Sequence, residues 1–327
     1  MRTGAAAGHA GYFHEAAFYR SDDELLDIVV PFLRDGVAAG EPTIVTFAER
    51  NAELVRSALP GDCGVRFLAG ADQYARPASC IRAYRSLFAR EVAAGAGQIR
   101  VVGDVPHPGL GMPWHGWARY EAAINHAYDQ FPIWGMCPYD TRITPDDVLA
   151  EVARTHPHVA TPDGVHRRNG DFQDPAAFLA QRAAAPPDPL QARPPALVLR
   201  DPSPADARHA VAALAADPPL PAGAPEDLAL AVSEVVTNAL EHGGRPCSLR
   251  AWRNADRVVV VVHDRGPGPA DPFAGLMPAA HAGSLDGGFG LWIASLVCDE
   301  VAFTTGPDGF TACLVVGRPH VPAPVGG

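Results

Sequence analysis

The stretch SEVVTNALEHGG, residues 233–244, decides how the second half of this chain is interpreted. Its polar residues stand at spacings that place them along one face of a helix, and they are Glu234, Asn238, Glu241 and His242. The residues between them are mostly apolar and predict a buried face behind the polar one. A polar face that contacts solvent is ordinary for one amphipathic helix. The motifs that follow therefore decide whether this face belongs to a functional site.

Two glycine-bearing motifs follow in order along the chain. HDRGPG, residues 263–268, ends a very hydrophobic predicted strand with an aspartate and two glycines. DGGFGLWIASLV, residues 286–297, places glycines directly before a predicted helix. The free N–H groups and the dipole of a helix N-terminus favour an anion such as phosphate. Each motif alone is common, whereas the order of all three is specific.

Composition limits the class of protein. A chain of 327 residues with 47% hydrophobic and 19% charged residues predicts two globular domains. The formal charge of −11 argues against direct binding of nucleic acid and favours a protein partner or a small ligand. The sequence contains 26 arginines and no lysine. It therefore has no Walker A lysine, no strand lysine of the kind found in the usual protein kinases and no lysine for Schiff-base chemistry.

No apolar run approaches the roughly 20 residues that cross a bilayer, and the first ten residues, MRTGAAAGHA, lack the apolar core of a signal peptide. We therefore expect a cytoplasmic protein without a membrane partner. The 6 cysteines include no CxxC pair, so their spacing indicates neither a zinc site nor a disulfide framework. We expect reduced and mostly buried thiols.

Residues 11–158 alternate between helical and strand patterns, which predicts a mostly parallel α/β sheet. Strands are expected at 43–47, 65–68, 98–104 and 132–137, and helices at 22–40, with Ser21 as the cap, and near 49–58, 78–95, 115–129 and 145–154. Residues 159–195 are rich in Pro and Ala and predict a linker with one short helix near 175–182.

Residues 196–318 predict a second domain. It is expected to begin with a strand at 196–200, helices at 204–216 and 224–242, and a hairpin of strands at 247–254 and 257–264. A helix at 289–298 and a hairpin of strands at 300–303 and 310–316 complete it. Helices and antiparallel strands in this order favour a two-layer α/β sandwich.

The three motifs, ExxxNALEH, DxGxG and GGxGL, fall on the expected elements and resemble the Bergerat ATP-binding fold of gyrase, histidine-kinase and mismatch-repair ATPases. They are most similar to the branch that contains the anti-sigma-factor serine kinases. This resemblance covers residues 196–318 and implies ATP and Mg²⁺ as cofactors. The fold uses no P-loop lysine, which agrees with the composition.

The resemblance implies a role for three residues of the second domain. Asn238 would coordinate Mg²⁺ through its amide oxygen, because magnesium prefers oxygen ligands. Asp264 would accept a hydrogen bond from the adenine amino group. Glu234 would act as the general base on the hydroxyl that is phosphorylated, since one helical turn places it beside Asn238. The alternatives are an ordinary turn aspartate and a glutamate that only orients water.

The resemblance also assigns the glycines. Gly266 and Gly268 would let the main chain approach the base and ribose, and Gly288 and Gly290 would let it approach the phosphates, although turn geometry alone can explain them. Residues 269–286 would form a lid over the nucleotide. His242 is interpreted as the end of its helix, before two glycines.

The segments 14–42 and 134–157 resemble the start and end of the methanogen/methylotroph sensory (MEDS) domain. That domain is similar to RecA-like α/β folds and is often fused to anti-sigma ATPase domains. If it binds a small molecule, the candidate residues are His14, Glu121, Asn125, Tyr139 and Asp140. Hydrogen bonding within the core explains each of them equally well.

Together the resemblances imply a sensory module joined to an ATP-dependent serine kinase. Its partners would be a STAS-type anti-anti-sigma protein, which it phosphorylates, and a sigma factor; related kinases often dimerise, so a homodimer is compatible with this interpretation. One alternative is an ATP-bound switch that sequesters its partner without phosphorylating it, and another is a metabolite sensor with a vestigial ATPase half. A histidine kinase is disfavoured, because a linker stands where its dimerising helical hairpin would be.

Overall fold

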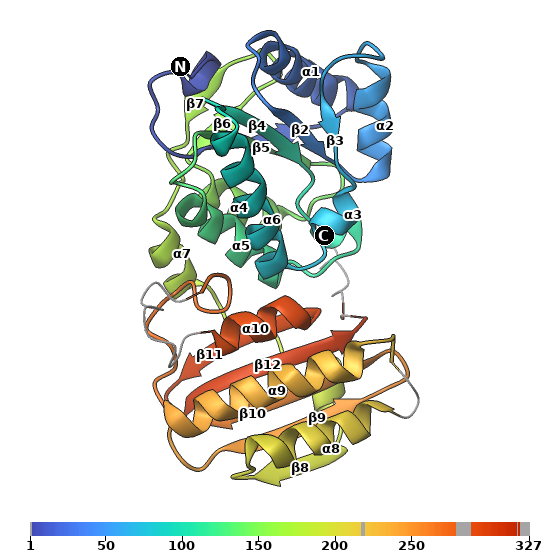
Figure 1. Cartoon of the computed structure of the whole chain (residues 1–327), viewed down its shortest axis with the longest axis vertical. Helices are drawn as coiled ribbons and strands as arrows, with labels where there is room; N and C mark the ends of the chain where they lie inside the picture. Colours follow the sequence, from blue (N-terminus) through green and yellow to red (C-terminus); the bar gives the residue numbers. More distant parts are fainter. Residues whose placement is uncertain (1, 217–219, 279–288, 319, 321–327) are drawn as a thin grey trace. The chain divides into compact units, whose positions relative to one another are not determined.

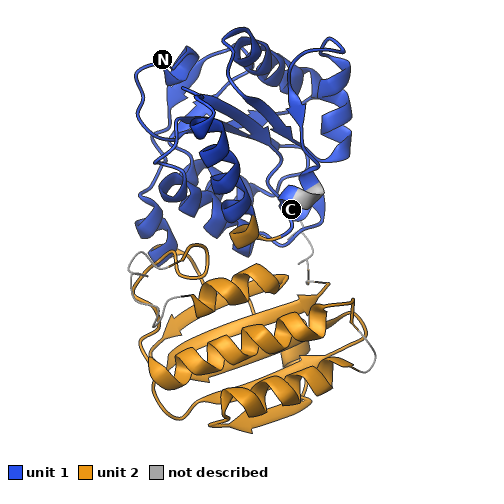
Figure 2. Cartoon of the chain, viewed as in Figure 1, with its two compact units in different colours: residues 1–75, 80–180, 323–327 blue, residues 76–79, 181–322 orange. Residues whose placement is uncertain are grey.

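A computed structural model describes residues 2–216, 220–278, 289–318 and 320. The chain divides into two compact units (Figure 2). The first is built from residues 1–75 and 80–180, and the second from residues 76–79 and 181–322. Each unit has its own sheet, which confirms the mixed α/β class predicted for the chain.

The sheet of the first unit has seven strands in the order β3-β2-β4-β5-β1-β6-β7 (Figure 1). The strands are β1 (Phe13–Tyr19), β2 (Thr43–Thr46), β3 (Arg66–Phe67), β4 (Ile99–Gly103), β5 (Ile133–Asp140), β6 (His158–Ala160) and β7 (His166–Arg168). All neighbours pair in parallel except β6 and β7, which are antiparallel. The predicted, mostly parallel sheet is therefore confirmed.

The helices of this unit follow the expected alternation with the strands. They are α1 (Asp22–Ala38), α2 (Glu49–Ser57), α3 (Gly70–Gln73), α4 (Pro77–Ala93), α5 (His115–Ala127), α6 (Asp146–Thr155) and α7 (Pro175–Gln181), with 3₁₀ turns η1 (Gly4–Ala6) and η2 (Pro108–Leu110). The predicted cap is present, because the Ser21 hydroxyl accepts the N–H of Glu24 at 3.1 Å. Side chains of α1 and α2 pack in one core cluster with alternate residues of β1 and β5.

Strand β1 is absent from the sequence prediction, although it lies inside the sheet between β5 and β6. Its sequence FHEAAFY contains two polar residues, His14 and Glu15, that are fully buried and interrupt the apolar run that would indicate a buried strand. Strands β6 and β7 lie largely within the predicted linker. The first part of that segment therefore contributes strands to the first sheet and is not a linker.

The second unit contains a five-stranded antiparallel sheet in the order β11-β12-β10-β9-β8. Its strands are β8 (Leu197–Arg200), β9 (Ser248–Arg253), β10 (Arg257–Asp264), β11 (Glu300–Gly306) and β12 (Gly309–Gly317). Helices α8 (Pro204–Ala216), α9 (Ala224–Glu241) and α10 (Gly290–Val297) lie over one face of this sheet (Figure 1). The predicted two-layer α/β sandwich is confirmed.

Strand β10 is hydrophobic along its whole length because both of its faces are covered. Val258, Val260 and Val262 belong to the core cluster under the helices. Val259 and Val261 point to the other face, where they pack with Leu190 of the 3₁₀ turn η3 (Pro189–Ala192). The end of the predicted linker is therefore part of the second unit.

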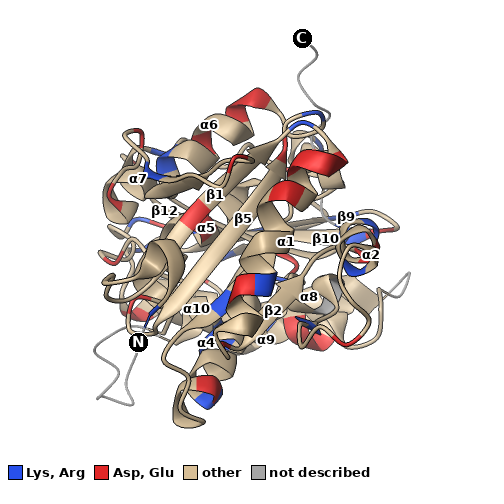
Figure 3. Cartoon of the chain, turned by 90° about the horizontal axis from the view of Figure 1, so that it is seen from above, with Lys and Arg blue, Asp and Glu red and all other residues tan. Residues whose placement is uncertain are grey.

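Charged residues lie mainly on helices and loops, and β5 is nearly free of them (Figure 3). Arg100 on β4 is a buried exception, with 1% of its surface exposed. Its guanidinium donates to Glu41 Oε2 at 2.7 Å, to the carbonyl of Phe32 at 2.8 Å and to the hydroxyl of Thr3 at 2.9 Å. Burial of this charge is tolerated because several partners satisfy it.

No helix in the described part of the chain is both long enough and apolar enough to span a bilayer.

Replacement of Arg100 by methionine should lower the free energy of unfolding by about 3–5 kcal/mol, because it leaves the Glu41 carboxylate buried without its cation. Urea denaturation followed by tryptophan fluorescence measures the change. The matched control Arg90→Met removes an exposed arginine and should change stability by less than about 0.5 kcal/mol. Equal stability of the two variants would show that the ion pair is not required.

Candidate functional site

Helix α9 carries the polar face that the sequence singles out. Glu234 and Asn238 are half-buried, whereas Glu241 and His242 are exposed. His242 ends the helix, and its N–H donates to the carbonyl of Asn238 at 2.9 Å, as predicted for a helix end. The polar face therefore divides into an inner pair, Glu234 and Asn238, which is partly covered, and an outer pair, Glu241 and His242, which faces solvent.

Asp264 ends strand β10 next to the end of α9. Its side chain is 4% exposed, and its Oδ1 atom accepts the N–H of Gly266 at 2.6 Å and that of Gly244 at 3.3 Å. A Cβ atom on Gly243 would lie 2.4 Å from this oxygen and 2.5 Å from the carbonyl oxygen of Ala239. The two elements can approach this closely only because Gly243 has no side chain.

Gly290 is the first residue of α10 and lies against the inner polar pair of α9. A Cβ atom on this glycine would be 2.6 Å from Asn238 Nδ2 and 3.2 Å from Glu234 Oε2. The main chain of Gly290 is therefore close to the side chains of both Asn238 and Glu234. The start of α10, where a helix has free N–H groups, faces the carboxylate and the amide.

A cavity of about 270 Å³ opens between these elements. Of the residues predicted from sequence, Asn238, Asp264 and Gly268 line it. Glu234, Gly266 and Gly290 are not part of its lining, but Gly266 bonds to Asp264 and Gly290 lies against Asn238. Gly288 lies outside the described residues.

The cavity walls are mostly apolar, and none of these residues except Met277, which belongs to the predicted lid, was given a role from sequence. They are Val235, Ala239, Val262, Met277, Leu291, Phe310 and Ala312. Their pattern in the sequence matches that of core residues, so no local signal distinguished them. The described part of the predicted lid also contributes to the lining, through Pro269, Ala270, Asp271, Ala274, Gly275 and Met277.

The polar groups around the cavity fit a nucleotide bound with magnesium. An apolar cavity with few polar groups is typical of a ligand site. The Asp264 carboxylate can accept a hydrogen bond from an amino group, and the Asn238 amide offers the oxygen ligand that a hard cation prefers. Gly290 lets the start of α10 lie against Asn238, where a Cβ atom would collide with the amide, and N–H groups at the start of a helix suit phosphate.

In the first unit, four of the five candidates lie together. His14 Nδ1 is 3.0 Å from Asn125 Oδ1, and the hydroxyl of Tyr139 donates to Glu121 Oε1 at 2.6 Å. Asp140 does not join them, because its carboxylate is paired with Arg142 at 2.6 Å. The structure therefore brings together the other four candidates and leaves Asp140 beside Arg142.

Two residues that sequence analysis did not select, Cys137 and His156, meet His14 and Glu121. Burial lowers the pKa of His14 and that of His156 to about 3, so both imidazoles are neutral at neutral pH. Burial also raises the pKa of the Glu121 carboxyl and that of the Cys137 thiol. The four groups could hold a metal ion.

Comparison with known families gives a match for each of the two units. Residues 201–316 match the family model described as Histidine kinase-like ATPase domain. Residues 13–157 match the model of MEDS, the MEthanogen/methylotroph, DcmR Sensory domain. The chain thus carries a MEDS domain followed by a histidine kinase-like ATPase domain, which confirms both resemblances.

Among solved structures, the chain is similar to the RsbU and RsbW domains of Rv1364c from Mycobacterium tuberculosis, with 21% sequence identity and a TM-score of 0.26. The match covers 38% of this chain and 32% of that chain, so it spans about a third of that structure. A comparison with curated proteins finds no significant match.

Replacement of Gly243 by alanine should destabilise the second unit by about 1–3 kcal/mol, because the new methyl group would collide with Asp264 and with the main chain of α9. Thermal denaturation measures the effect. Gly306→Ala is the matched control, since a Cβ atom there meets nothing within 4 Å. Equal melting temperatures for the two variants would contradict the close approach of α9 and β10.

Proposed function

We propose that the chain is an ATP-dependent protein serine kinase of the anti-sigma type. It binds Mg-ATP in the cavity of the second unit and phosphorylates a serine of a STAS-type protein. In a separate complex it holds a sigma factor, and the MEDS domain supplies the sensory input. The observation that supports this proposal best is the position of Glu234 and Asn238, which approach the first residue of α10 together.

Each polar group of the site has a separate task in this proposal. Asp264 accepts a hydrogen bond from the adenine amino group, and this selects adenine over guanine because guanine has no amino group at that position. Asn238 holds the metal ion through its amide oxygen. The N–H groups at the start of α10 hold phosphate oxygens in place of the absent lysine.

Glu234 is the general base in this proposal. Its carboxylate lies one helical turn before Asn238 and accepts the proton of the serine hydroxyl that is phosphorylated. When bound, Mg-ATP would supply the phosphoryl group and leave as ADP, and the metal would offset the negative charge of the phosphates. Glu234 does not line the cavity and stands beside it, which suits a group that meets a protein substrate at the edge of a nucleotide site.

The metal role of Asn238 can be tested without knowledge of the partner. Asn238→Ala should weaken Mg²⁺-dependent ATP binding more than about tenfold, or by about 1.4 kcal/mol, because the amide oxygen is lost. Isothermal titration measures the affinity. Glu241→Gln alters an exposed residue of the same helix and should bind as the wild type does. If the wild type binds no ATP, the proposal fails and the ATPase half is vestigial.

The catalytic role of Glu234 needs a protein acceptor. Glu234→Gln should reduce the transfer of label from ATP to a STAS-type protein of the same cell by about 10²–10⁴-fold, because a general base contributes that much. Its affinity for ATP should be unchanged. Glu241→Gln is again the control.

Two outcomes would contradict this assignment. Transfer by Glu234→Gln at the wild-type rate would remove Glu234 from the mechanism. ATP binding by the wild type without transfer to any STAS-type protein would identify a switch that sequesters its partner and does not phosphorylate it.

A further inference from the structure

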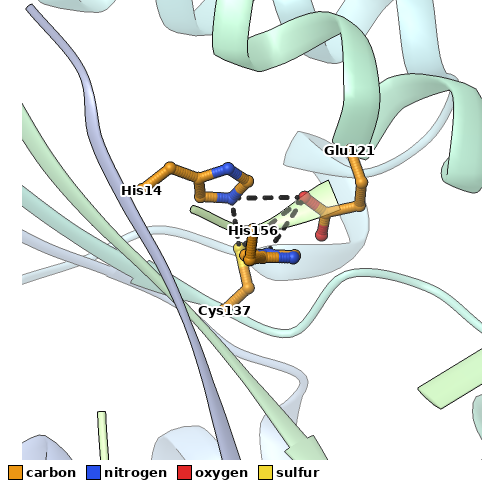
Figure 4. A group of neighbouring side chains, drawn as sticks. All are labelled: His14, Glu121, Cys137 and His156. Atoms are coloured by element: carbon orange, nitrogen blue, oxygen red, sulfur yellow. Dashed lines mark hydrogen bonds and ion pairs between the residues drawn. The ribbon is translucent and has the colours of Figure 1, made fainter. Parts of the chain in front are cut away.

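Four side chains of the first unit bring one atom each to a common point (Figure 4). His14 comes from β1, Glu121 from α5, Cys137 from β5, and His156 follows the end of α6. Their ligand atoms all lie within 4.8 Å of one another, and all four residues are buried. This cluster is separate from the nucleotide cavity and plays no part in the proposed kinase chemistry.

Hydrogen bonds fix the tautomer of His14. The Asn125 side-chain nitrogen donates to the carbonyls of Glu121 at 2.9 Å and Thr155 at 2.9 Å, so its oxygen faces the histidine. That oxygen accepts the N–H of His14 Nδ1 at 3.0 Å. The Nε2 atom of His14 therefore carries a lone pair and points into the cluster.

The same reasoning applies to His156. Its Nδ1 atom donates to the carbonyl of Val152 at 2.8 Å, which leaves a lone pair on Nε2. The Nε2 atom is buried and has no hydrogen-bond partner. A buried nitrogen without a partner is costly unless another group satisfies it.

Glu121 places an acceptor between these two nitrogens. Tyr139 donates to its Oε1 atom, and its Oε2 atom is 3.4 Å from His14 Nε2 and 3.5 Å from His156 Nε2. These separations exceed the 2.7–3.2 Å or so of an N–H···O hydrogen bond. A proton shared between the carboxyl group and one histidine would also leave the second nitrogen unsatisfied.

Three of the four printed separations are close to those of a tetrahedral metal site. Ligand distances of about 2.0–2.3 Å to zinc give edges of about 3.3 Å between nitrogen and oxygen and about 3.5 Å to sulfur. The observed edges are 3.4 and 3.5 Å between nitrogen and oxygen, 3.5 Å from Cys137 Sγ to His14 Nε2 and 4.0 Å from Cys137 Sγ to Glu121 Oε2. The two remaining edges, from His156 Nε2 to His14 Nε2 and to Cys137 Sγ, lie within 4.8 Å, so a central ion would draw the ligands closer together.

Ligand chemistry selects the class of ion. Two neutral imidazoles, a thiolate and a carboxylate together carry two negative charges, which balance one divalent cation. Sulfur and nitrogen ligands suit zinc and similar transition metals and disfavour magnesium and calcium. Asn125, the Val152 carbonyl and Tyr139 orient three of the ligands, as outer partners do in metal sites.

We propose that the first unit binds one divalent transition-metal ion, zinc foremost, through His14 Nε2, Glu121 Oε2, Cys137 Sγ and His156 Nε2. Four buried protein ligands make this a closed site that stabilises the fold or senses the metal, not a catalytic one. The ion links β1 and β5 of the sheet to α5 and the end of α6.

The test uses the full-length chain, made without a histidine tag and in medium that contains zinc, so that a buried site is filled as the protein folds. Elemental analysis after gel filtration should find about one zinc per chain. Growth with cobalt should give the thiolate-to-cobalt charge-transfer band and the strong visible bands of tetrahedral cobalt. This spectrum requires no variant, so it remains informative if a substitution prevents folding.

Variants then assign the ligands. Cys137→Ser and His156→Gln should lower the retained zinc at least about tenfold, and the cobalt-thiolate band should disappear in Cys137→Ser. The control Cys63→Ser removes a half-buried thiol of the same unit and should keep both signals. Asn238→Ala should also keep its zinc, which separates this test from that of the nucleotide site.

Three results would overturn the proposal. The first is a wild-type protein that is folded by circular dichroism but contains no zinc and is not stabilised when refolded with zinc. The second is full zinc content in both Cys137→Ser and His156→Gln. The third is a cobalt spectrum without a thiolate band, because Cys137 would then not be a ligand.

Discussion

The close approach of α9 to the end of β10 is the contact on which the cavity of the second unit depends. Two main-chain N–H groups bond to Asp264, and Gly243 allows the helix end to reach that carboxylate. Asn238 lies one turn before the helix end and is held at the same cavity. The polar positions of the site are therefore set by main-chain groups that meet the Asp264 carboxylate, and a side chain at Gly243 would separate them.

The elements of the second unit are well predicted from sequence because short local patterns specify them. Helix α8 was expected at 204–216 and occupies Pro204–Ala216, and the hairpin of β9 and β10 was recognised from two strand patterns and a short turn. The polar site residues stand in short motifs and could be selected directly. The apolar cavity walls could not, since Phe310 and Leu291 have the same local pattern as core residues.

The first unit was harder to predict because its buried polar groups are satisfied over long sequence distances. His14 meets Asn125, and Glu15 accepts from Trp134 at 2.6 Å, so neither residue shows locally that β1 is a strand. The cysteine spacing gave no sign of a metal site, since only Cys137 contributes a sulfur. Such a cluster has no sequence signature and becomes visible only when the sheet brings its members together.

The position of β1 has a consequence for the order in which this unit assembles during synthesis. Residues 13–19 are made early, but the strands that flank them, Ile133–Asp140 and His158–Ala160, are made more than a hundred residues later. Parallel pairing over such separations closes large loops and is slow. We expect β1 to remain unpaired on the ribosome until nearly half of the polypeptide has emerged, which makes this segment a natural target for chaperones that protect unpaired strand edges.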